Sequence, residues 1–263
     1  MTDSKNVLFG FLMFFFIFLF VIAIWKLTLL FLRTPQLYHQ KIFFFLISIG
    51  SCGRIVCFFF QTFFWDFYSD NSKNTFNPLM AFFSDFFLSA FFTLIFTLAQ
   101  VNFQVKNFSP LDAKHQLRNF IIVFTLTNVV VYAVHIPLIA THTDKLNFFL
   151  VSMYSICAIG LLGYSSLLLS SFYKKRPMAN VMIIKKIFYV LLASTICYIL
   201  RIPILIIGNL NSDDISDNQY ALISFFYYLI CEILPLCLII FVLFVSPPKR
   251  NKYEITENNT MLQ

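Results

Sequence analysis

The sequence is poor in charged residues, since only 12% of its 263 residues are Asp, Glu, Lys or Arg, whereas 59% are hydrophobic. A soluble globular domain carries about twice that charged fraction, so the composition excludes an ordinary water-soluble fold. The mean hydropathy is +0.80. At about 20 residues per crossing, the chain has room for roughly seven transmembrane helices and for no separate soluble domain of ordinary size. The sequence therefore predicts an all-α membrane protein surrounded by the lipid bilayer.

The sequence also lacks the motifs of common catalytic and metal sites. It contains no His-Glu-x-x-His helix, nucleophile elbow, Walker loop or cysteine-based metal site. A metal site formed by His135, His142 and Asp144 is the weaker interpretation, because histidines in loops are usually solvated. The six cysteines all fall in apolar stretches, so they predict no disulfide framework. We therefore expect no enzymatic activity, no cofactor and no bound metal.

Long apolar stretches, separated by turn residues, run through the sequence. The predicted spans are about 7–32, 42–64, 78–101, 119–140, 146–173, 187–208 and 220–245. Each is long enough to cross a hydrocarbon core of about 30 Å. The first stretch is not a cleaved signal peptide, because it lacks a basic flank before it and a small-residue cleavage site after it. We expect a single seven-transmembrane domain over 1–263, with 246–263 as a short cytosolic tail.

Lysine and arginine are unevenly divided between the two sets of alternate loops. One set contains Lys26, Arg33, Lys41, Lys106, Lys114, Arg118, Lys174, Lys175, Arg176, Lys185, Lys186, Lys249, Arg250 and Lys252. The other contains Lys5, Lys73 and Lys145. Cytosolic loops carry the excess of positive charge, so we expect a luminal or extracellular N-terminus and a cytosolic C-terminus. The net charge of +7 then reflects topology and does not indicate nucleic-acid binding.

Charged residues are rare within the membrane interior. Arg54, Asp85, Arg201 and Glu232 are the candidates, and each costs on the order of a few kcal/mol at mid-bilayer unless it has a partner. At about 1.5 Å per residue, Arg54 and Glu232 both lie near the midplane, which predicts an ion pair. Asp85 and Arg201 share a depth nearer the luminal side and predict a second pair. A contact between Arg201 and Glu232 is the competing arrangement.

Two tyrosines are spaced to join these charges in a polar network. Tyr198 precedes Arg201 by three residues and Tyr228 precedes Glu232 by four, so each can share a helix face with its charged neighbour. Two uses of the network stay open. It is either a switch, proton relay or ligand site, or a polar clasp that fixes the order of the helices.

Prolines and glycines mark special backbone positions in the same spans. Pro203 and Pro235 remove backbone hydrogen bonds beside Arg201 and Glu232, which predicts helix kinks that either act as hinges or only shape the bundle. Small residues permit close approach of helices, and the candidates are Gly50, Gly53, Gly160 and Gly163.

Basic clusters in the predicted cytosolic loops are candidate partner-binding residues. They comprise Lys174, Lys175, Arg176, Lys185, Lys186, Lys249 and Arg250. Such a cluster can bind a protein or anionic headgroups, the latter at about 1 kcal/mol per charge. The competing interpretation is that these charges serve only to set topology.

The last span carries the most specific sequence pattern. It reads Phe225-Phe226-Tyr227-Tyr228-Leu229-Ile230-Cys231-Glu232-Ile233-Leu234-Pro235 and is followed by Pro247-Pro248-Lys249-Arg250. Further matching segments, in the same order along the chain, are Leu32-Arg33-Thr34-Pro35, Arg54, Ala99-Gln100-Val101 with Gln104, Ile196-Cys197 and Leu200-Arg201. These residues resemble the tobamovirus multiplication protein family of plants, whose relatives include animal lysosomal orphan receptor-like proteins. The resemblance covers nearly all of the chain.

The resemblance implies a receptor-like, non-enzymatic seven-span protein of the vacuolar or lysosomal membrane, with the plasma membrane as the alternative location. It also implies recruitment or regulation of cytosolic proteins, which in plants include tobamovirus replication proteins and a small Arf-like GTPase, and in animals Rag GTPases.

Two other functions are weighed against this one. A ligand-sensing G-protein-coupled receptor is disfavoured because the third span ends in Gln100-Val101-Asn102 rather than Asp-Arg-Tyr, and because the last span lacks Asn-Pro-x-x-Tyr. A small or proton-coupled transporter would use the buried charges. An odd number of spans without visible repeated halves weakens that alternative.

Overall fold

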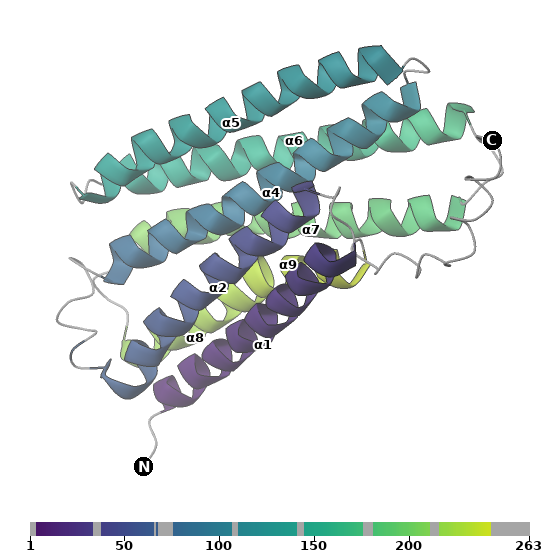
Figure 1. Cartoon of the computed structure of the whole chain (residues 1–263). Coiled ribbons are helices and arrows are strands. Elements are labelled where there is room, and N and C mark those ends of the chain that lie inside the picture. The colour runs from purple at the N-terminus through teal and green to yellow at the C-terminus, as the bar shows by residue number, and fades with distance from the viewer. Residues whose placement is uncertain are drawn as a thin grey trace.

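The computed structural model describes residues 4–33, 38–65, 67, 76–106, 110–140, 145–175, 181–210 and 216–242. Those residues form helices and no strand. The helices are α1 (Ser4–Arg33), α2 (Tyr38–Phe63), α4 (Asn77–Lys106), α5 (Pro110–Ala140), α6 (Lys145–Lys175) and α7 (Val181–Leu210). A last continuous segment comprises α8 (Asp217–Tyr228), the π-helical turn η2 (Leu229–Ile233) and α9 (Leu234–Val242). The segments run back and forth along one bundle (Figure 1).

Five of these segments are long and apolar enough to cross a membrane. They are Ser4–Leu32, Gln40–Phe63, Pro78–Thr97, Phe149–Leu167 and Asn218–Phe241. The apolar stretches within the described parts of α5 and α7 are shorter, Ile122–Leu138 and Phe188–Ile204. Buried polar residues such as His135 and Arg201 lie in these two helices. The chain is therefore a multi-pass integral membrane protein, whose helices follow the apolar stretches expected from the sequence.

The helix α1 shows how an almost wholly apolar helix divides between core and lipid. Its buried side chains follow a seven-residue repeat, which places them on one stripe. These are Phe9, Leu12, Phe16, Leu19, Ala23 and Leu30. Large apolar side chains between them are exposed, among them Phe14, Val21 and Phe31. The stripe packs against α2 and α8, and the exposed face meets the lipid.

The helices close a ring around a mostly apolar core that also contains buried polar residues. In order, α1 contacts α2, α2 contacts α4, α4 contacts α6, α6 contacts α7, α7 contacts η2 and α9, and α8 returns to α1. The helix α5 lies outside this ring, against α4 and α6 (Figure 1). Consequently α4 is enclosed by α2, α5 and α6, and every residue from Phe87 to Phe96 is buried.

Glycine allows α2 and α4 to approach closely. A Cβ atom placed on Gly53 would lie 2.1 Å from the Phe83 ring, and one on Gly50 would lie 2.9 Å from the Phe87 ring. Both positions therefore have the packing role expected from the sequence. In α6, a Cβ on Gly160 would lie 3.1 Å from Ile95, whereas one on Gly163 would meet nothing within 4 Å. The expected close approach at Gly163 is absent.

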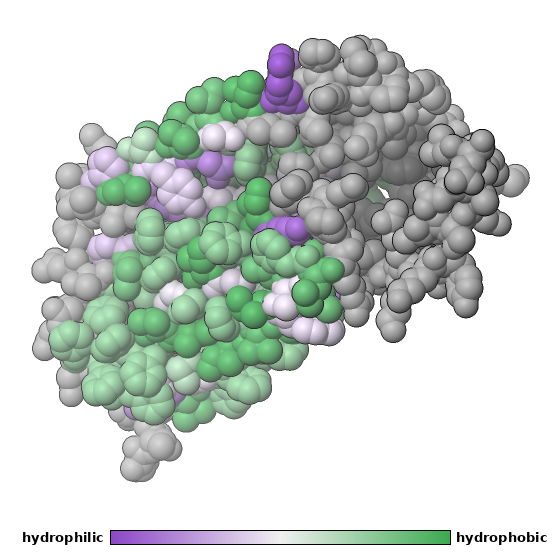
Figure 2. Space-filling view, viewed as in Figure 1, coloured by the Kyte–Doolittle hydropathy of each residue, from purple (hydrophilic) through white to green (hydrophobic). Residues whose placement is uncertain are grey.

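The outer surface is apolar over the part of the molecule that the structure describes. Figure 2 shows a face on which hydrophobic residues form an extended region, with few hydrophilic residues between them. The exposed large apolar side chains come from every helical segment except α4. Exposed apolar surface of this extent is typical of a protein surrounded by lipid.

Candidate functional site

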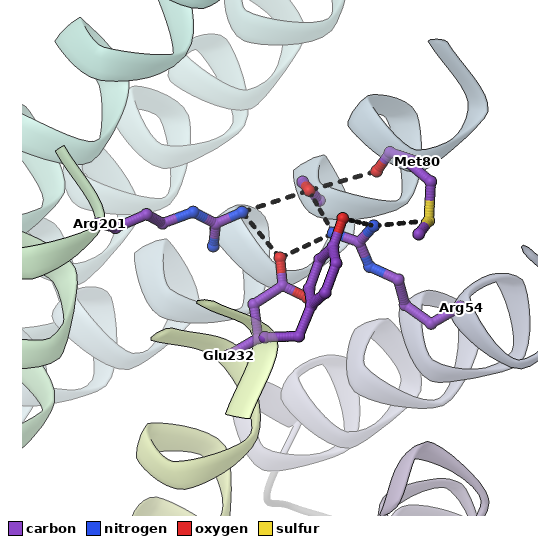
Figure 3. Close-up of polar contacts among 6 residues, drawn as sticks. Arg54, Met80, Arg201 and Glu232 are labelled. Atoms are coloured by element: carbon purple, nitrogen blue, oxygen red, sulfur yellow. Dashed lines mark hydrogen bonds and ion pairs between the residues drawn. The ribbon is translucent and has the colours of Figure 1, made fainter. Parts of the chain in front are cut away.

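Three charged side chains meet in the middle of the bundle, although they are far apart in the sequence. Arg54 comes from α2, Arg201 from α7 and Glu232 from η2. Their exposed fractions are 1%, 2% and 2%. In Figure 3 the two arginines approach the glutamate from opposite sides. We call these three residues the charge cluster.

Both arginines bind the same carboxylate oxygen. Arg54 Nη2 and Arg201 Nη2 each donate to Glu232 Oε1, at 2.7 Å in both cases. The structure thus contains the expected pair of Arg54 with Glu232. The expected pair of Arg201 with Asp85 is wrong, because Arg201 reaches Glu232 instead. The reason is packing, since α7 lies directly against η2.

Residues of α4 complete the hydrogen bonds of the cluster. Ser84 Oγ accepts from Arg54 Nη2 at 2.6 Å and from Arg201 Nη2 at 3.3 Å, and it donates to the Met80 carbonyl at 3.2 Å. The second nitrogen of Arg54, Nη1, donates to Met80 Sδ at 2.8 Å (Figure 3). Sequence reasoning missed both residues, although Ser84 directly precedes the predicted site residue Asp85.

Aromatic rings cover the two guanidinium groups. The guanidinium carbon of Arg54 lies 4.6 Å from the Tyr228 ring centroid, and Arg54 Nη1 donates to the Tyr228 hydroxyl at 3.4 Å. The guanidinium carbon of Arg201 lies 4.1 Å from the ring centroid of Tyr154 and 5.2 Å from the ring centroid of Tyr227. Such cation–π contacts partly replace the lost hydration of a buried cation. Tyr228 therefore belongs to the network, as the sequence predicted.

The predicted role of Tyr198 is not what the structure shows. Tyr198 is 1% exposed, and its ring packs against Phe91 at 4.3 Å and against Tyr154 at 5.7 Å between centroids. It supports the ring that covers Arg201 and does not itself hydrogen-bond to the charge cluster. Tyr154, which lies in the neighbouring predicted span 146–173, was not predicted as a member of the network.

The backbone around Glu232 departs from a regular α-helix. Pro235 has no N–H group and cannot donate to the Cys231 carbonyl, so the regular hydrogen-bond pattern fails there. The N–H of Leu234 instead bonds to the Leu229 carbonyl, five residues earlier. This wider turn changes the register of the helix at Glu232, the residue that binds both arginines. Single π-helical turns within α-helices are frequent at functional sites. In α7, the helix continues through Pro203 to Leu210.

A second buried polar contact lies between α4 and α5. His135 Nδ1 contacts Asp85 Oδ2, and both residues are 0% exposed. The sequence-based view of His135 as a solvated histidine near a loop is therefore wrong, because the inner face of α5 packs on α4 at this level. Both residues lie at a similar depth below the same end of the bundle, and this similarity could have predicted the pair from the sequence. His142 and Asp144, the other members of the disfavoured metal site, lie outside the described residues.

The predicted basic partner-binding residues are not tested by the structure. Arg176, Lys249 and Arg250 lie outside the described residues, as does the predicted tail 246–263. Lys174, Lys175, Lys185 and Lys186 belong to helices α6 and α7, but their side chains are not described. Within the part of the chain that the structure describes, no group of three His, Cys, Asp or Glu residues is arranged to hold a metal ion.

The charge cluster is well suited to hold helices together or to change state. Among the described residues, Glu232 Oε2, the Nε atoms of both arginines and the Tyr154 hydroxyl are buried without a hydrogen-bond partner. Incomplete satisfaction is costly in an apolar interior. The cluster therefore combines strong ion pairs with polar atoms that have no partner within the described bundle.

Comparison with known proteins identifies the family. The model of the THH1/TOM1/TOM3 domain matches residues 2–258, nearly the whole chain. No curated protein and no solved structure matches the chain. The match confirms the resemblance noted in the sequence of the last span. The chain belongs to the THH1/TOM1/TOM3 domain family, which is the family of the tobamovirus multiplication proteins.

Proposed function

We propose that this protein is a non-enzymatic, receptor-like membrane protein that recruits or regulates cytosolic partners such as small GTPases. The observation that carries the proposal is the family match over residues 2–258. The charge cluster supports it, because such a cluster is expensive in lipid and is rare unless it stabilises a bundle or serves a function. We further propose seven spans, a cytosolic C-terminus and a location in the vacuolar or lysosomal membrane.

The cluster suggests how the two sides of the membrane would communicate. Arg54, Arg201 and Glu232 join three helical segments, α2, α7 and η2, at one point. A change that separates one arginine from Glu232 would therefore move a helix that continues toward the cytosolic loops. The basic residues of those loops would supply the partner-binding surface.

Proximity labelling from a tag on the C-terminal tail tests this function in cells. Enrichment of small GTPases of the Arf-like or Rag type is the expected result, and the labelled protein should colocalise with a vacuolar or lysosomal marker. A variant with Lys185 and Lys186 changed to Gln should lose part of this enrichment. A matched control changes Lys5, on the opposite side of the proposed topology, and should retain it. Enrichment of heterotrimeric G proteins, or of no cytosolic partner at all, would contradict the proposal.

A further inference from the structure

The Asp85–His135 pair has no role in the function proposed above. Asp85 lies on α4 and His135 on α5, and neither side chain has exposed surface. Only one nitrogen of the imidazole, Nδ1, contacts the carboxylate. The other nitrogen, Nε2, is buried without a hydrogen-bond partner among the described residues, as is Asp85 Oδ1.

The contact constrains where the protons are. An ionised carboxylate can only accept hydrogen bonds, so with Asp85 ionised the contact places the imidazole proton on Nδ1. Nε2 then carries a lone pair that accepts no hydrogen bond from the part of the chain that the structure describes. A buried, unpartnered basic nitrogen beside a carboxylate is the arrangement that accepts a proton, because the resulting imidazolium is paired with the carboxylate next to it.

Charged and titratable groups face this pair from each packed helix. On α5, Tyr132 hydrogen-bonds to Ser89 at 2.9 Å. On α6, Tyr154 lies within electrostatic range of Asp85, and the Phe149 ring lies 5.4 Å from the imidazole. On α7, the positive charge of Arg201 also acts on Asp85.

The charges of the two buried sites balance. With both carboxylates ionised, Asp85 and Glu232 supply two negative charges, which match the positive charges of the buried Arg54 on α2 and Arg201 on α7. Protonation of the imidazole would therefore leave this interior with one excess positive charge.

We propose that the Asp85–His135 pair is a proton-binding site, with Nε2 of His135 as the atom that binds the proton. An O–H bond of a hydronium ion breaks, its proton bonds to the Nε2 lone pair, and the neutral imidazole becomes an imidazolium ion while a water molecule is left. Ser84, which binds both arginines, is the neighbour of Asp85 on α4. A change of charge at Asp85 and His135 would thus act on α4, the helix whose Ser84 hydrogen-bonds to both arginines of the charge cluster.

The position of the pair indicates the side from which the proton enters. Asp85 lies eight residues after the start of α4 and His135 five residues before the end of α5, or about 12 Å and about 8 Å along the helix axes. Both helix ends lie at the same end of the bundle (Figure 1). In the proposed topology this is the luminal end. The proton site itself does not depend on the proposed recruitment of cytosolic partners.

Nitrogen-15 NMR of a single-histidine protein tests the proposal directly. The sequence contains four histidines, so His39→Gln, His115→Gln and His142→Gln together leave His135 alone. The full chain is labelled on histidine, purified in detergent and compared with the wild type in helix content and unfolding temperature. We expect Nδ1 to carry a proton throughout the titration and Nε2 to gain one as the pH is lowered.

Asp85→Asn in the same background provides the second measurement. Removing the carboxylate takes away the counter-ion of the imidazolium, so a smaller fraction of Nε2 should be protonated at any given pH. A nitrogen that keeps one protonation state from about pH 8 to about pH 4 would overturn the proposal. So would a midpoint that Asp85→Asn leaves unchanged. If that variant does not fold, the titration of the single-histidine protein decides the question.

Discussion

At the scale of single residues, the charge cluster is asymmetric. Glu232 binds two cations through one oxygen, whereas each arginine has further partners, namely Ser84 for both and Met80 and Tyr228 for Arg54. Removing the carboxylate leaves two buried cations without a counter-ion. Removing one arginine leaves the other ion pair intact. The three residues should therefore differ in how much stability depends on them.

We expect Glu232→Gln to be the most destabilising single change in the cluster. The loss should be about 3–5 kcal/mol, because an unpaired buried charge costs that much. The measurement is denaturant-induced unfolding of the purified protein in detergent.

Arg54→Gln and Arg201→Gln provide the comparison and should each cost less than Glu232→Gln. Adding Arg54→Gln to Glu232→Gln should recover part of the loss, since one of the two unpaired cations is then gone. Strict additivity of the two changes would contradict the ion pair.

At the scale of elements, the fit between α2 and α4 depends on the absence of a side chain at one position. A methyl group on Gly53 would collide with the Phe83 ring. We expect Gly53→Ala to destabilise the protein by about 1–3 kcal/mol, as overpacking of a filled interior does. Thermal unfolding in detergent measures the effect.

The matched control is Gly163→Ala in α6, where a Cβ would meet nothing within 4 Å. That change should be neutral or stabilise by up to about 1 kcal/mol, because alanine favours helix more than glycine does. If both changes had the same effect, the close approach of α2 and α4 would not be what matters at Gly53.

The elements themselves followed from the sequence, because long apolar stretches bounded by turn residues have few other ways to fold in lipid. The backbone geometry beside Glu232 and the partners of the buried polar residues did not follow from the sequence. Pro235 indicated a lost hydrogen bond beside Glu232, but not that the helix would widen into a π-turn. The partner of Arg201 depended on which helices are neighbours, a tertiary property that depth alone does not determine. His135 was misjudged because histidine is intermediate between buried and exposed residue types, so the residue type alone does not determine its burial.

At the scale of the whole molecule, the proposed seven crossings place the two termini on opposite sides of the membrane. We expect a glycosylation acceptor tag added before residue 1 to be modified in cells, and the same tag added after residue 263 to remain unmodified. The physical reason is the excess of lysine and arginine in one set of loops. Gel mobility with and without glycosidase treatment provides the measurement, and modification of both tags, or of neither, would contradict an odd number of crossings.

The arrangement of the charge cluster also has a consequence for synthesis. The two arginines belong to the second and sixth helical segments of the described chain, but the carboxylate that neutralises them belongs to the last. A growing chain would therefore hold uncompensated cations in the bilayer until its final helix left the ribosome. Incomplete products, lacking that helix, would present the insertion machinery with the exposed polar groups by which cells recognise unfinished membrane proteins for degradation.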